Sequence, residues 1–245
     1  MRLALVHTRY QLLETVRIPI ALVGSAFFPA ASMLFFVVPF SGDDPVTATY
    51  ATASMVTFSV MTTNIFQYGI GVAEDRAQPW DPYLRTLPAG AAPRFAGRIL
   101  AGLLLTMLSL IPVVVIGAVG TAARVTGPAF LAALGTVVVA AVPFTLMGLA
   151  IGYSLPSRAA IVVAQVLFFP LAVGGGLLFP PDQSPGFIQT IAPFLPTRGA
   201  VELMWAAVGD FPVNPLSLTM LGVWIVVLAT IAGWAYRRDE GRRFS

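Results

Sequence analysis

The chain has 245 residues, of which 57% are hydrophobic and 10% are charged, and its mean hydropathy is +0.84. Soluble domains are typically about 45–50% apolar and about 25% charged, so this composition excludes an ordinary soluble enzyme. The chain has no Cys and no Lys, which excludes disulfides, Cys-ligated metals and a Walker A nucleotide-binding loop. Its arginines are scattered over separate connectors, so a nucleic-acid-binding patch is not expected.

Apolar stretches near the length of a membrane-spanning helix recur along the whole chain. Residues 2–17 mix charged residues into apolar sequence, so no cleavable signal core precedes Ile18. We therefore expect an all-α integral membrane protein with one transmembrane domain over 1–245. Its six predicted spans are 18–40, 46–71, 97–119, 128–152, 159–179 and 216–236.

The arginines are distributed unevenly over the connectors between these spans. Only Arg124 and Arg198 fall on one side of the membrane, whereas all the others fall on the side of both termini. Because arginine-rich connectors face the cytoplasm, both termini are predicted to be cytoplasmic.

The second predicted span is unusually polar for a helix in lipid. Ser59, Thr63 and Gln67 share one helical face, with Asn64 beside them. Ser and Thr often join neighbouring helices by hydrogen bonds, which is the first interpretation. The second is a translocation path lined by Ser59, Thr63, Asn64, Gln67, Phe58 and Phe66.

The connector 72–90 is the most polar internal stretch of the chain. A short helix there would gather Trp80, Tyr83, Leu84 and Leu87 on one face, with charged residues at the rim. Either an interfacial loop with aromatic anchors or a docking surface for a soluble partner fits this composition.

Residues 180–215 form a proline-rich connector that is still apolar. Pro193 and Pro196 interrupt it, so 186–210 is expected not to cross the membrane. Arg198 and Glu202 are four residues apart and would pair on a helix.

These features, in this order, resemble the permease subunits of type 2 ABC exporters. Glu74-Asp75-Arg76 looks like the charged cluster of that family's cytoplasmic loop, and Trp80-Asp81 looks like its aromatic–acidic pair. Tyr83-Leu84-Arg85-Thr86-Leu87-Pro88 looks like the loop's ending, although Gln78-Pro79 stands where the family usually has Gly-Thr. Gly174–Gly176, Phe179-Pro180 and Pro185-Gly186-Phe187 fit the family pattern before the last span.

The resemblance implies an N-terminal interfacial helix at 2–17, a cytoplasmic coupling helix within 72–90 and a re-entrant hairpin at 186–210. It implies a separate ATPase subunit, in two copies per complex, which would bind ATP and Mg and contact Glu74, Asp75, Arg76, Trp80, Asp81, Tyr83, Leu84, Arg85 and Leu87. It also implies a second permease subunit, as homodimer or heterodimer, in the cytoplasmic membrane of a bacterium. The exported compound would be hydrophobic or amphipathic: a drug, an antibiotic or a lipid.

Other classes of membrane protein fit the residues less well. An intramembrane hydrolase needs Ser with His, or paired acids, at membrane depth, and the single His7 lies before the first span. An ion-coupled carrier usually needs ionisable residues within its spans, which contain almost none. We therefore expect no catalytic residue, metal or cofactor on this chain; an ion-coupled carrier and a non-transport membrane scaffold are the alternatives.

Overall fold

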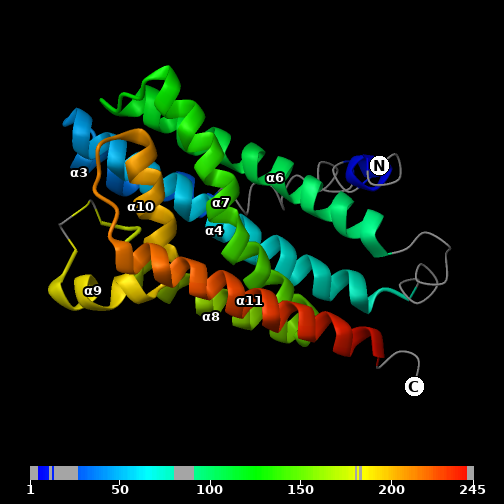
Figure 1. The fold of residues 1–245 in the computed structure, drawn as a ribbon. Helices are drawn as coiled ribbons and strands as arrows, with labels where there is room; N and C mark the ends of the chain where they lie inside the picture. Colours follow the sequence, from blue (N-terminus) through cyan, green and yellow to red (C-terminus); the bar gives the residue numbers. More distant parts are fainter. Residues whose placement is uncertain are drawn as a thin grey trace.

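The computed structural model describes residues 5–10, 13, 27–79, 91–179, 181 and 184–241, with the side chains of 91–95 and 241 excepted. All regular secondary structure within these residues is helical (Figure 1). Residues 5–10 form a helical segment, and residues 27–32 lead into a π-helical turn, η1. The remaining elements follow in the order η1 (Met33–Val37), α3 (Val38–Ser41), α4 (Pro45–Ala77), α6 (Ala91–Gly120), α7 (Gly127–Ser154), α8 (Ser157–Gly174), α9 (Gly186–Ile191), η2 (Ala192–Phe194), α10 (Pro196–Val208) and α11 (Pro215–Gly241).

Helix α4 lies at the centre of the bundle and contacts α6, α7, α8 and α10. It begins at Pro45 because Asp44 caps it: the Asp44 carboxylate accepts a hydrogen bond from the Thr47 backbone N–H at 2.7 Å. The hydrogen bonds from Thr47 lower the pKa of Asp44. Most side chains between Ala48 and Ala73 are buried against the surrounding helices, which explains why this helix can be polar without exposing hydroxyl groups to lipid.

Four helices within the described residues are long and apolar enough to cross a membrane: Ala96–Gly120, Gly127–Ser154, Ser157–Gly174 and Pro215–Glu240. They correspond to the last four predicted spans. The first predicted span, 18–40, is described only from residue 27, where Phe27–Ser41 is apolar but short. The second, 46–71, lies within α4, which has the length of a span but not the apolar composition. Four candidate spans are therefore observed, and the full set of six stays a prediction.

Two glycines of α7 allow it to approach α4 closely. A Cβ atom on Gly148 would lie 2.8 Å from the Asn64 carbonyl oxygen, and one on Gly152 would lie 2.6 Å from the Tyr68 carbonyl oxygen. Real Cβ atoms do not approach backbone this closely. The two glycines are four residues apart, the small-residue spacing by which helices pack closely in membranes.

The segment predicted to be re-entrant forms two short helices, α9 and α10, joined by η2. The chain turns into this segment at Gly176, whose φ of 78° favours glycine. Helix α10 has 13 residues and is therefore roughly 20 Å long, less than the roughly 30 Å of a hydrocarbon core. It packs against α4, α7 and α11.

The glycine contact predicts unequal effects of alanine at two positions of α7. Gly148→Ala should destabilise the protein by about 1–3 kcal/mol, because its methyl group would overlap α4 backbone. Gly135→Ala is the matched control: a Cβ there meets nothing within 4 Å, so its effect should be neutral or slightly stabilising. Unfolding of the purified protein in detergent measures both, and equal stability of the two variants would contradict the close contact.

Candidate functional site

Three hydroxyl groups meet in the middle of the contact between α4 and α6. The Ser109 hydroxyl oxygen lies 2.9 Å from the Thr63 hydroxyl oxygen and 3.3 Å from that of Ser59. All three side chains are buried. Two of the residues predicted for the translocation path, Ser59 and Thr63, are thus hydrogen-bonded within the chain.

Asn64 joins α4 to both α6 and α7. Its amide nitrogen donates to the Val60 carbonyl oxygen at 2.7 Å and to the Thr106 hydroxyl at 3.2 Å. Its amide oxygen accepts a hydrogen bond of 2.9 Å from the Thr145 hydroxyl. Asn64 is 1% exposed, so its polar atoms are satisfied by neighbouring helices, as the packing interpretation of this span requires.

The other predicted path residues contact α8 or have side chains that are only partly buried. Phe58 is buried and stacks on Phe168 with ring centroids 5.5 Å apart, and Phe66 contacts the same ring at 5.7 Å. Phe66 and Gln67 are only partly buried. The structure therefore brings together Ser59, Thr63 and Asn64 on the side of α6 and α7, and places Phe58 and Phe66 at α8.

Sequence analysis missed the partners of these residues: Thr106, Ser109, Thr145 and Phe168. Thr106 and Ser109 carry the only hydroxyl groups between residues 99 and 119, and they are three residues apart. Two hydroxyls on one face of an apolar helix indicate a polar contact with another helix. That signal was present in the sequence, whereas nothing local marks Phe168 among the other apolar residues of α8.

The charged cluster at the end of α4 divides into residues with different partners. Arg76 donates to the Asp239 carboxylate on α11 through Nε at 3.0 Å and Nη2 at 2.5 Å. Its Nη1 donates to the carbonyl oxygens of Gly152 at 2.7 Å and Leu155 at 3.1 Å, at the end of α7. Arg76 thus ties together the ends of three helices, and the Asp239 side chain is only 4% exposed.

The neighbouring acids are more accessible. Asp75 pairs with Arg98 of α6, and its side chain is 51% exposed. Glu74 is also exposed. The other predicted coupling residues lie outside the described residues: Trp80, Asp81, Tyr83, Leu84, Arg85 and Leu87.

A second ionic network lies at the opposite end of α4. Arg198 and Glu202 form the predicted pair, with Nε and Oε1 2.5 Å apart, which confirms the pairing expected from their spacing. The buried Glu202 carboxylate also accepts from the Asn214 backbone N–H at 2.9 Å and the Ser217 hydroxyl at 3.1 Å. These contacts join α10 to the start of α11.

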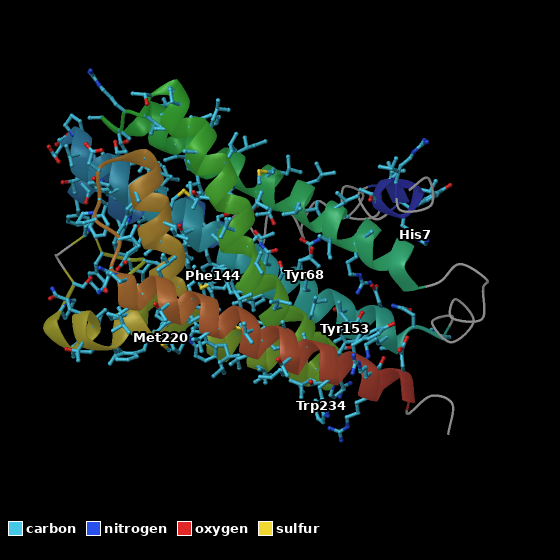
Figure 2. The ribbon with its side chains drawn as sticks, in the orientation of Figure 1. His7, Tyr68, Phe144, Tyr153, Met220 and Trp234 are labelled. Atoms are coloured by element: carbon cyan, nitrogen blue, oxygen red, sulfur yellow. The ribbon has the colours of Figure 1, made fainter. Side chains whose placement is uncertain are left out.

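The described residues contain no group of three His, Asp or Glu side chains that could hold a metal ion. Their chemistry is instead that of helix association: neutral polar contacts in the middle and ion pairs at both ends. Figure 2 shows side chains along the bundle, with Tyr153 and Trp234 towards the end where α4 and α11 finish.

Comparison with known proteins matches residues 3–208 to the family described as ABC-2 type transporter. The chain is also similar to a protein of Bacillus subtilis (strain 168) named "Putative transport permease YvfS". The two are 23% identical over 187 residues, which cover 76% of each chain.

The Arg76–Asp239 pair predicts a large loss of stability when one partner is removed. Arg76→Ala should cost about 3–5 kcal/mol, because the buried Asp239 carboxylate would lose the charged hydrogen bonds that Arg76 donates to it. The double variant Arg76→Met with Asp239→Leu should recover only part of that loss, because the Gly152 and Leu155 carbonyl oxygens still lose their donor. Asp75→Asn, at the more exposed pair with Arg98, should cost less than about 1 kcal/mol. Denaturant titrations of the purified variants compare them; a similar small loss for Arg76→Ala and Asp75→Asn would contradict this assignment.

Proposed function

Since the chain belongs to the ABC-2 type transporter family, we propose that it is the membrane-spanning permease subunit of an ATP-driven exporter. It moves a hydrophobic or amphipathic compound out of the cytoplasm or the inner leaflet. The family match over residues 3–208 is the observation that carries this proposal. The similarity to a protein named as a transport permease supports it.

The proposal places the energy source on another polypeptide. The chain has no Lys for a Walker A loop, so ATP and Mg bind to an ATPase subunit present in two copies. The permease acts with a second permease subunit, identical or related, in a bacterial cytoplasmic membrane. Both termini face the cytoplasm, a topology supported by the arginine distribution.

The ATPase docks at the end of α4 and on the residues that follow it. Arg76 is occupied by Asp239 and by α7 carbonyls, so its part is to hold the end of α4 in place. Glu74 is exposed and offers an acidic group to a partner, whereas Asp75 is already paired with Arg98. Charges at such a rim contribute more to orientation and association rate than to affinity, while Trp80, Leu84 and Leu87 supply apolar contact.

A single cysteine at Glu74 tests both docking and orientation, because the chain has no native Cys. A membrane-impermeant maleimide should label Glu74→Cys in inverted vesicles and not in intact cells. Labelling should increase after urea removes peripheral ATPase from the vesicles. Arg124→Cys is the matched control: it lies in the connector between α6 and α7, is exposed, and should be labelled only from outside, with or without urea. Labelling of Glu74→Cys that urea leaves unchanged would refute the docking site.

The translocation path borders α4 at Phe66 and Gln67, where this helix is only partly covered by the chain itself. Ser59, Thr63 and Asn64 lie behind this face of α4 and do not line the path, because their polar atoms form hydrogen bonds with α6 and α7. Phe58 supports the same face through its stack on Phe168. A pathway of this kind is mainly apolar with few polar groups, which suits a hydrophobic cargo.

Leucine at Gln67 and at Asn64 should therefore have different effects. Gln67→Leu should change the substrate concentration that half-maximally stimulates ATPase activity, with the yield of assembled complex unchanged. Asn64→Leu should lower that yield, because the Thr145 hydroxyl loses its acceptor at a cost of about 1–3 kcal/mol, while Thr106 keeps its bond to the Gly102 carbonyl oxygen. Substrate-stimulated ATPase activity per assembled complex distinguishes the two. If Gln67→Leu lowers only the yield, Gln67 is a packing residue.

A further inference from the structure

A recess lies where the ends of α4, α7 and α11 meet, and the proposed transport mechanism does not use it. It is lined by Arg76 of α4, by Tyr153 and Ser154 of α7, and by Trp234, Arg238 and Asp239 of α11. About 300 Å³ of space there, counted together with the open solvent at its mouth, is not filled by protein atoms. Figure 2 shows Tyr153 and Trp234 near this end of the bundle.

The recess carries a positive charge that the described residues leave uncompensated. Arg76 and Asp239 neutralise one another in their ion pair. Arg238 is exposed, and its guanidinium lies 5.0 Å from the centroid of the Trp234 ring. Glu240, two residues further along the helix, accepts a hydrogen bond from the Tyr236 hydroxyl and does not line the recess. Arg238 forms no ion pair with any residue that the structure describes, so its donors are available to an anion.

The other groups at the recess suit a phosphate at a membrane surface. Ser154 is exposed, and its hydroxyl has no hydrogen bond to the described part of the chain, so it adds a neutral donor. Trp234 is 57% exposed and lies near the end of an apolar helix, where Trp and Tyr typically mark the membrane–water interface. The long Arg238 side chain reaches from there towards the headgroup layer.

An apolar stripe leads from the recess along the outside of α11. Val227, Ile231 and Trp234 follow one helical face, and all three are exposed. A ligand with a phosphate in the recess would thus have a hydrophobic surface for an attached chain. A free phosphate ion would leave this surface unused.

We propose that this recess binds the phosphate group of an anionic phospholipid, with Arg238 and Ser154 as donors and with an acyl chain along Val227, Ile231 and Trp234. Basic recesses between transmembrane helices at the cytoplasmic side are suited to anionic headgroups. The charge distribution of the chain assigns this end to the cytoplasm.

Native mass spectrometry of the purified full-length protein, titrated with phosphatidylglycerol or phosphatidylcholine, tests the site. Arg238→Gln should weaken phosphatidylglycerol binding roughly fivefold, the typical contribution of one basic residue at an anionic surface. Arg237→Gln is the matched control: the same charge is removed from the adjacent exposed position, which does not line the recess. It should bind phosphatidylglycerol as the unmodified protein does. Phosphatidylcholine, whose choline cation cancels the charge of its phosphate, should lose less affinity than phosphatidylglycerol in Arg238→Gln.

Three results would overturn the proposal. Equal losses in Arg238→Gln and Arg237→Gln would indicate attraction to the whole helix end rather than a site. No loss in either variant would exclude Arg238 as a ligand. Competition of excess inorganic phosphate with phosphatidylglycerol in the unmodified protein would indicate a site for a soluble anion. Equal melting temperatures of both variants in detergent micelles show that any difference in binding does not arise from unfolding.

Discussion

The close contact between α4 and α7 at Gly148 and Gly152 is the constraint on which the rest of this bundle depends. A polar helix such as α4 is poorly suited to lipid, so it has to be enclosed by other helices, and side chains at these two positions would hold α7 away. The Asn64–Thr145 hydrogen bond needs that approach. The Arg76 bond to the Gly152 carbonyl oxygen needs it as well, since a glycine of the contact supplies the acceptor.

Polar groups are sorted along the bundle by the cost of burying them. Charged pairs occur at its two ends, at Arg76–Asp239 and at Arg198–Glu202. Between them the contacts of α4 use hydroxyl and amide groups, such as Thr63 with Ser109. An isolated charge at membrane depth is costly. This arrangement lets helices in the middle of the bundle pair specifically through neutral polar groups, without ionisable ones.

Local sequence predicted those features that depend only on residues close together in the chain. The lengths of the apolar runs indicated α6, α7, α8 and α11, and the four-residue spacing predicted the Arg198–Glu202 pair. The partner of Arg76 is 163 positions away in the chain, and which face of α11 meets α4 depends on packing that no local pattern encodes. The hydroxyl side chains of α4 likewise allowed two interpretations, because their environment is set by Thr106, Ser109 and Thr145 on other helices.

Helix α4 runs for 33 residues from Pro45 to Ala77, and its contact with the α7 glycines lies between Asn64 and Val72. At about 1.5 Å per residue, and measured from Tyr68 in the middle of this contact, the part of α4 before it is roughly 35 Å long and the part after it roughly 14 Å. A rigid tilt of α4 about this contact would move the start of the helix more than twice as far as its end. The longer part of α4 is linked to Trp205 of α10, whose indole N–H donates to the Tyr50 carbonyl oxygen and the Ser54 hydroxyl. If α4 tilts as a rigid body about this contact, a small displacement beside Glu74 becomes a larger one at α10.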